Sequence, residues 1–219
     1  RDFRFRGTLV SNGDVGCKGR SERQRCNATG TTHGSIEQIG GKWYVFYHRL
    51  THGSDYSRQC CAEKLDILPD GSIAQAEMTS CGLNDGDLPG TGEYPAAICC
   101  NLTNGKMPHI ANQIRRNIPV ITHSDMEWYV GNAEKGTQIG YKYFSIQNNT
   151  VLRVTARGKG RIHIKVNDKS VGSLTYHSEK WTAASLTISQ GNPHAALCLT
   201  VTEGNLDILS LHLSPEVNE

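Results

Sequence analysis

The sequence lacks a long apolar run, a strongly amphipathic helical pattern and a large excess of charge of either sign. No apolar run approaches the roughly 20 residues that a membrane-spanning helix needs, and the formal net charge is only +2 at pH 7. Nucleic-acid-binding domains usually carry a marked basic excess. These absences predict no membrane partner and no nucleic-acid partner, and they leave the cellular compartment open.

Cysteine is present, but it lacks the spacing of a metal site. None of the eight cysteines forms a C-x-x-C motif, so a zinc ribbon is not indicated. Cys60-Cys61 and Cys99-Cys100 are adjacent pairs. Neighbours on a strand point to opposite faces, so one member of each pair suits a buried position. We therefore expect mostly free thiols, with a Cys17–Cys26 disulfide as the alternative.

Glycine is abundant, at 23 residues, which suits an all-β chain with many tight turns. In the first half, short runs rich in aromatic and β-branched residues are separated by turn signals such as Gly40-Gly41 and Leu68-Pro69-Asp70-Gly71. They predict strands over residues 35–39, 42–48, 59–67 and 72–79. Four strands in up-and-down order are typical of one propeller blade, so residues 1–105 are predicted to be a propeller portion.

The second half shows a different pattern. Periodicity is weak between residues 84 and 123, which favours a connecting region, placed at 106–126. Strict alternation then returns, as in Arg161–Val166, where Ile162 and Ile164 share one face. Gly158–Gly160 and Asn167–Lys169 look like hairpin links. About seven strands over residues 127–219 predict a jelly-roll-like β-sandwich.

Two stretches carry a family resemblance. Thr29–Glu37, with its His-Gly-Ser triplet, is followed by Gly41–Arg49 and by Tyr56-Ser-Arg-Gln59 leading into Asp70–Ile73. Together they resemble the end of the five-bladed propeller of glycoside hydrolase family 43. Residues 127–219 resemble, more weakly, carbohydrate-binding module family 6, through the strand pattern, Ile139–Phe144, Val171-Gly172 and Trp181.

The resemblance implies inverting hydrolysis of glycosidic bonds by an arabinofuranosidase- or xylosidase-like enzyme. That chemistry needs two carboxyl groups far enough apart to admit a water molecule. In the family the catalytic Asp, Asp and Glu lie on earlier blades, and none maps onto this sequence. The chain begins without Met, so we expect a piece of a longer protein whose N-terminal propeller portion is its partner. We expect the chain alone to be inactive; the alternative is a non-catalytic carbohydrate-binding or structural module.

Three residues carry over as candidates for binding. His33 matches a channel histidine that binds a metal ion, usually Ca²⁺, or an ordered water; the alternative is a hydrogen-bonded core histidine. Arg58 matches an arginine near the sugar and the base carboxylate; the alternative is a surface arginine. Trp181 is a candidate for stacking on a sugar ring, with a core position as the alternative. The implied ligands are arabinose- or xylose-containing glycans, with no organic cofactor. His48 and His52 have i, i+4 spacing, but a strand end followed by a loop does not favour a metal pair.

Overall fold

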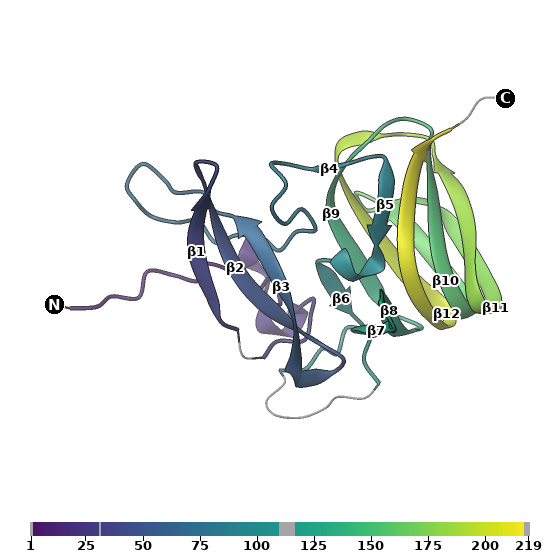
Figure 1. Ribbon diagram of the computed structural model, residues 1–219, viewed down its shortest axis with the longest axis horizontal. Helices are drawn as coiled ribbons and strands as arrows, with labels where there is room; N and C mark the ends of the chain where they lie inside the picture. Colours follow the sequence, from purple (N-terminus) through teal and green to yellow (C-terminus); the bar gives the residue numbers. More distant parts are fainter. Residues whose placement is uncertain (1, 31, 110–116, 217–219) are drawn as a thin grey trace.

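The protein is all-β, which confirms the predicted fold class, and its strands form two sheets (Figure 1). The computed structural model describes residues 2–30, 32–109 and 117–216. The elements are η1 (Cys17–Gly19), η2 (Glu22–Gln24), β1 (Gly34–Ile39), β2 (Lys42–Thr51), β3 (Ser54–Lys64), β4 (Leu88–Pro89), β5 (Gly92–Pro95), η3 (Ala96–Ile98), β6 (Asn101–Thr103), β7 (Val120–Ser124), β8 (Glu127–Glu134), β9 (Gln138–Ile146), β10 (Thr150–Val166), β11 (Lys169–Ile188) and β12 (Asn192–Pro215). In the part of the chain that is described, no helix is long and apolar enough to cross a membrane.

The first sheet contains three antiparallel strands in the order β1-β2-β3. The predicted hairpin is confirmed, and its turn residues Gly40 and Gly41 have φ of 56° and 79°, a region that glycine enters at no steric cost. Gly34 lies against β2 so closely that a Cβ atom there would stand 2.2 Å from the Phe46 carbonyl oxygen. The middle position of the His-Gly-Ser triplet therefore requires glycine.

The predicted fourth strand of this sheet, residues 72–79, is wrong. Within this segment Ile73 forms only an isolated bridge to Ile67. The backbone N–H of Met78 donates to the Asp14 carboxylate, and that of Thr79 donates to the Glu63 carboxylate. Because these donors are satisfied by side chains, they are not available for a ladder with a neighbouring strand.

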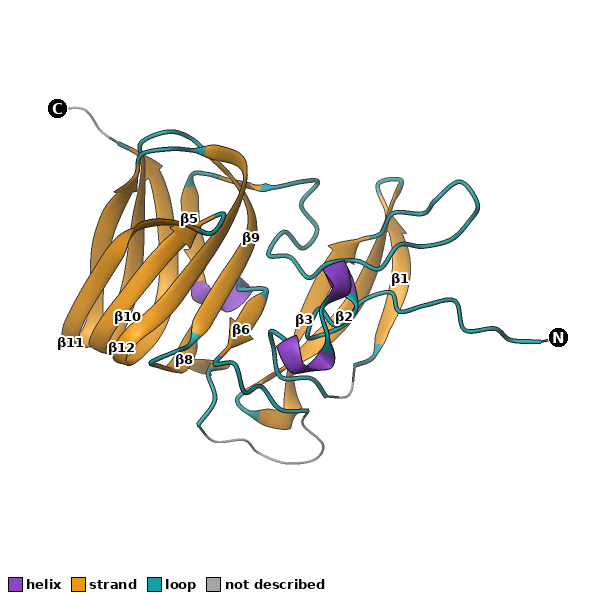
Figure 2. Ribbon diagram, turned by 180° about the vertical axis from the view of Figure 1, so that it is seen from behind, coloured by secondary structure: helices purple, strands orange, loops and turns teal. Residues whose placement is uncertain are grey.

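The larger sheet forms the sandwich at the other end of the molecule (Figures 1 and 2). Its order is β11-β10-β12-β8-β7; β9 pairs with β12, β4 and β6, and β5 pairs with β12. The predicted alternation is confirmed, because the residues that share one face are buried in a single core. They include Leu152, Val154, Ile162, Ile164, Leu197, Leu199, Leu211 and Leu213.

Residues 127–215 form five long strands, β8 to β12, rather than seven short ones. The predicted link Gly158–Gly160 lies inside β10. A Cβ at Gly158 would stand 2.5 Å from the Asn205 carbonyl oxygen, so glycine there permits the close approach of β12 rather than a turn. Asn167 and Asp168 do form the predicted turn, with φ of 47° and 65°.

Strands from the predicted first domain also join the sandwich. β4, β5 and β6, within residues 88–103, hydrogen-bond to β9 or β12. The predicted linker contains β7, while its residues 110–116 lie outside the described residues. All eight cysteines are free thiols, as expected, so Cys17 and Cys26 are not joined.

Arg49 couples the two sheets. It lies on β2 with only 5% of its surface exposed, and its guanidinium donates to the backbone carbonyls of Ala97 and Cys99 beside η3. Its Nε donates to Gln59 Oε1 at 2.9 Å. A buried guanidinium is tolerated because its donors are satisfied in this way.

Arg49→Met should therefore weaken folding. The substitution removes the donor to the buried Cys99 carbonyl and one of the two donors to the Ala97 carbonyl, so we expect the free energy of unfolding to fall by about 2–4 kcal/mol. Urea unfolding followed by tryptophan fluorescence measures the change. Arg153→Met, at an exposed position of β10, is the matched control and should be nearly neutral. Equal stability of the two variants would contradict the coupling role of Arg49.

Candidate functional site

His33 and Arg58 lie around His48 on one face of the three-stranded sheet. His33 is exposed and immediately precedes β1, and its ring centroid lies 5.3 Å from that of His48. His48 pairs with Cys60 across β2 and β3, and Arg58 is two residues before Cys60 on β3. Cross-strand partners share a face, and so do residues two apart on a strand. The structure thus brings the two predicted residues to the same face and the same end of the sheet.

A second cluster lies beside them, where the β2–β3 turn meets the sandwich. His52 adopts φ of 58° in this turn, and its N–H donates to the Ile121 carbonyl of β7 at 2.8 Å. Its ring centroid is 4.8 Å from that of His123 and 5.6 Å from that of Trp128. The hydroxyls of Thr51 and Ser57 contact its Nδ1 at 3.0 and 2.9 Å. Burial, and secondarily the neighbouring His123, lower the pKa of His52.

Sequence analysis missed His123 and Trp128. They are cross-strand partners in the β7–β8 hairpin, whose turn is formed by Asp125 and Met126. The usable signal was this short polar turn between two apolar runs, because a two-residue turn brings positions 123 and 128 face to face. Their contact with His52 depends on the packing of two sheets and had no local signal.

The residues around His33 do not by themselves form a calcium site. Calcium prefers six to eight oxygen ligands, whereas the ring next to His33 is a second imidazole, that of His48. Within the described ranges, no group of three or more His, Cys, Asp or Glu residues could hold a metal ion. His48 and His52 do not form a metal pair either, since their rings contact different partners.

Two carboxylates of the first portion, the buried Glu63 and the half-buried Glu77, are engaged in structural contacts. Glu63 accepts hydrogen bonds from Tyr47 and from the backbone and hydroxyl of Thr79 at 2.6–3.0 Å. Glu77 accepts bonds from Lys18, Lys142 and the Tyr143 hydroxyl. Every carboxylate oxygen of both residues has a partner. The arrangement suits anchors between segments and gives no support for a catalytic acid and base among them.

Trp181 lies on β11, half-buried and outside the hydrophobic core. The guanidinium carbon of Arg157 stands 4.3 Å from the Trp181 ring and 5.2 Å from the Tyr129 ring. Asp207 holds this guanidinium in place, with its Oδ2 atom 3.0 Å from Nε and 2.9 Å from Nη2. The Tyr129 and Trp181 ring centroids are 5.5 Å apart, so two aromatic rings and a fixed cation form one compact cluster on the sandwich surface. Sugar stacking by Trp181 stays a prediction, now with Arg157 and Tyr129 as neighbours.

Comparison with known proteins finds similarity to carbohydrate enzymes. No family model matches the chain. A xylosidase/arabinosidase of Thermoclostridium stercorarium is 36% identical over 208 residues, which cover 87% of this chain and 44% of that protein. The chain is thus similar to part of a xylosidase/arabinosidase. It spans less than half the length of this curated relative.

Solved structures agree with this fold. A glycoside hydrolase family 43 arabinoxylan arabinofuranohydrolase from Bacillus subtilis, in complex with cellotetraose, matches 98% of this chain and 45% of its own, with a TM-score of 0.52 and 16% identity. The module CsCBM6-3 of Clostridium stercorarium, in complex with cellobiose, matches 60% of this chain and 99% of its own, with a TM-score of 0.48 and 14% identity. The likeness to the family 43 structure, together with the relative above, agrees with the resemblance to family 43 that the sequence predicted.

The two anchoring carboxylates predict opposite effects of pH on stability. Burial raises the pKa of Glu63 to about 7, against the lowering effect of the bonds from Thr79 and Tyr47. Burial would also raise the pKa of Glu77, but hydrogen bonds from Lys18 and Lys142 lower it to about 2. The contribution of Glu63 to the free energy of unfolding is therefore present below about pH 4.5 and lost as the pH rises through 7. The contribution of Glu77 is present above about pH 4.5 and lost as the pH falls through 2.

Unfolding measured by urea at a series of pH values between 2 and 9 tests both assignments. Glu77→Gln should flatten the acid side of the stability profile, and Glu63→Gln should flatten the side between pH 5 and 8. Glu179→Gln, at an exposed position, should leave the profile unchanged. A wild-type profile that does not change in either range would contradict both pKa assignments.

Proposed function

We propose that this chain is the C-terminal part of a glycoside hydrolase that acts on arabinose- or xylose-containing glycans by inverting hydrolysis. The observation that carries the proposal is the 36% identity to a xylosidase/arabinosidase over 208 residues. Inverting hydrolysis places a general acid and a general base on opposite sides of the sugar, with room for a water molecule. In this proposal the upstream portion of the protein supplies both carboxyl groups.

We further propose residues 1–105 as the propeller portion, 106–126 as the linker and 127–219 as the sandwich, with β4 to β6 of the first portion and β7 of the linker contributing strands to the sandwich sheet. Exposed apolar side chains support an upstream partner for the first portion. Ile36, Ile39 and Trp43 on the β1–β2 hairpin are 37–43% exposed, and Phe3 and Phe5 are 99% and 87% exposed. Ile36 and Trp43 share one face of the hairpin, because Trp43 pairs with Gln38, two residues from Ile36. Exposed apolar groups on one face favour contact with further protein.

Within that enzyme, Arg58 is the proposed sugar-binding residue of this chain. Its guanidinium presents several fixed donors, and its charge favours the ionised form of a nearby base carboxylate. His33 is the proposed channel residue, binding an ordered water or a hydrated metal ion. A Ca²⁺ ion there would need oxygen ligands from water or from the upstream portion, and no step of the proposed reaction depends on it.

The alternative is a carbohydrate-binding or structural module without catalysis. The cluster formed by Trp181, Arg157 and Tyr129 is the observation that favours binding by the sandwich. An aromatic face contacts the C–H groups of a sugar ring, and the fixed guanidinium can donate to its hydroxyls. Binding by the sandwich is compatible with either role, so activity is the property that separates them.

Hydrolysis of aryl arabinofuranosides and xylosides tests the enzymatic role. We expect no turnover by the 219-residue chain alone. A chimera in which this chain replaces the matched segment of the Thermoclostridium protein should be active. In the chimera, Arg58→Ala should lower kcat/KM about a hundredfold, as the loss of a donor to the reacting sugar does, while Arg153→Ala should have little effect. An inactive but folded chimera would favour the non-catalytic alternative, and full activity of Arg58→Ala would remove Arg58 from the site.

Trp181→Ala tests binding by the sandwich. If Trp181 stacks on sugar rings, the substitution should weaken binding of xylo-oligosaccharides while the melting temperature stays nearly constant. Calorimetric titration and thermal unfolding measure the two effects, with Trp43→Ala on the other sheet as the control for binding. A stability loss of about 3–5 kcal/mol, typical of a large core side chain, with unchanged affinity would assign Trp181 to packing instead.

A further inference from the structure

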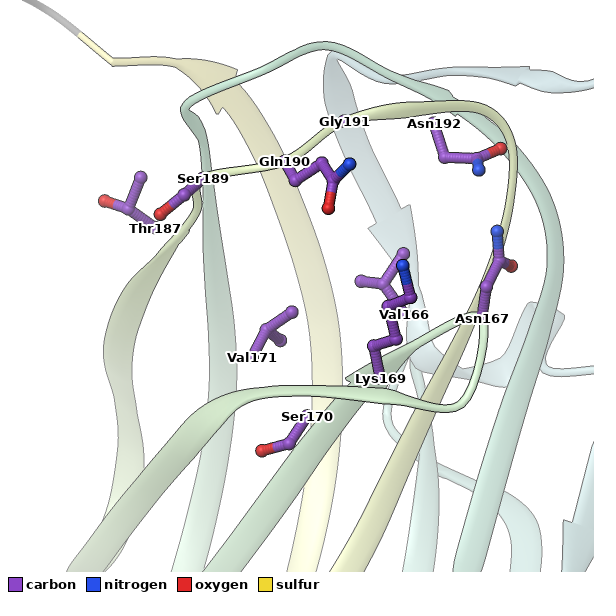
Figure 3. Close-up of a pocket in the computed structure, with 10 residues that line it drawn as sticks. All are labelled: Val166, Asn167, Lys169, Ser170, Val171, Thr187, Ser189, Gln190, Gly191 and Asn192. Carbon is purple, nitrogen blue, oxygen red and sulfur yellow. The ribbon is translucent and has the colours of Figure 1, made fainter.

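A cavity at one end of the sandwich is separate from both sites described above (Figure 3). It encloses about 310 Å³ between the β10–β11 turn and the loop from β11 to β12. This volume lies at the lower end of the range for small-ligand pockets. Its lining consists of Val166, Asn167, Lys169, Ser170, Val171, Thr187, Ser189, Gln190, Gly191 and Asn192. None of these residues belongs to the cluster around Trp181.

Both walls of the cavity are fixed by hydrogen bonds. On one wall, Asn167 accepts a bond from the Ala196 N–H at 2.7 Å and donates to the His194 carbonyl at 3.3 Å. On the other, the Gly191 N–H donates to Asn148 Oδ1 at 2.8 Å. A Cβ at Gly191 would stand 2.4 Å from the Ile146 carbonyl oxygen, so glycine permits this loop to lie close over β9. The cavity is thus held open before any ligand binds, which lowers the entropic cost of binding.

Two of the polar side chains at the cavity, those of Gln190 and Lys169, are available for a ligand. Figure 3 shows the Gln190 side chain extending from the loop toward the cavity and the Lys169 side chain rising toward it beside Val166. Neither Gln190 nor Lys169 makes a side-chain hydrogen bond or ion pair with any other residue that the structure describes. Lys169 is the only charged residue in the lining, so the cavity favours an anion.

The remaining lining defines the rest of the ligand. Val166 and Val171 supply an aliphatic surface suited to the C–H face of a ring. The amides of Gln190 and Asn192 can each donate and accept hydrogen bonds, as hydroxyl groups require. We propose that this cavity binds a uronic acid, with its carboxylate at Lys169 and its hydroxyls at Gln190 and Asn192. That the ligand is a sugar rests in part on the proposed function. That it carries a carboxylate rests on the charge of Lys169.

The uronic acid can be free or a branch of a glycan, and titrations of the intact chain distinguish the two. The probes are glucuronic acid, a xylo-oligosaccharide carrying one glucuronosyl branch, and the same oligosaccharide without the branch. We expect the branched probe to bind more tightly than the neutral one, with an affinity that falls as salt is added. Lys169→Met should remove this preference and weaken binding of the branched probe about tenfold or more, because a hydrogen bond to a charged group is lost.

Lys159→Met is the matched control, since Lys159 is an exposed lysine further along β10, away from this turn. It changes the net charge equally and should keep the preference. Gln190→Ala should weaken the branched and the free acid alike. Binding of glucuronic acid alone at comparable affinity would assign the site to the free acid; binding of only the branched probe would assign it to a glycan.

The proposal is overturned if the branched and neutral probes bind equally, or if Lys169→Met and Lys159→Met have the same effect. This result is distinguishable from failure of the proposed function. Trp181→Ala affects binding of the neutral probe, whereas Lys169→Met affects only the contribution of the carboxylate. Amide chemical shifts should change at residues 166–171 and 187–192 on addition of the acid, and changes confined to the region of Trp181 would also contradict the cavity assignment.

Discussion

The buried ammonium group of Lys142 holds the parts of this protein together. Lys142 lies on β9 of the sandwich, and its Nζ atom is 3.1 Å from Asp14 Oδ2 and 2.9 Å from Glu77 Oε1. Asp14 belongs to the N-terminal segment, and Glu77 to the segment after β3. Asp14 uses its other oxygen to accept the Met78 N–H. One charge on the sandwich therefore fixes two irregular segments that cover the three-stranded sheet. Removing one member of such a network leaves an uncompensated buried charge, which is strongly destabilising.

This constraint explains why the region after β3 is irregular. In an isolated blade, residues 72–79 would be free to extend the sheet, and their composition allows it. Here the carboxylates of Asp14 and Glu63 take backbone donors of this segment, while Glu77 is held by Lys18 and Lys142. The polar groups of residues 77–79 are thus bonded to three different parts of the chain: the N-terminal segment, β3 and β9. Through these bonds the segment links the three-stranded sheet to the sandwich. A regular edge strand would bond only to its own sheet and leave its outer donors free.

The parts of the fold that could be predicted from sequence are those fixed by local periodicity. Alternation identified β2 and the core face of β10 and β12, and the Asn167-Asp168 turn followed from residues that tolerate positive φ. The failures share one cause. The conformation of residues 72–79 depends on Asp14, and the glycines of β10 are required by the close approach of the β12 backbone. Both contacts join positions that are far apart in the sequence. The same holds for the site, where His33 and Arg58 could be matched by motif but the neighbours of His52 and Trp181 could not.

The β2–β3 turn carries this coupling into the candidate site. His52 donates its backbone N–H to β7, so the end of the sheet that carries Arg58 is bound directly to a sandwich strand. Arg49, on the opposite face of β2 from His48, adds bonds to the carbonyls beside η3. Both attachments connect the end of the sheet that carries Arg58 to the sandwich, so the two proposed glycan-binding regions belong to one hydrogen-bonded unit. Effective concentration between two sites is greatest when the connection holds them at a fixed, matching span. In the proposed enzyme, a long glycan that follows the junction where His52, His123 and Trp128 lie would gain affinity from the sandwich, which contributes no catalytic group.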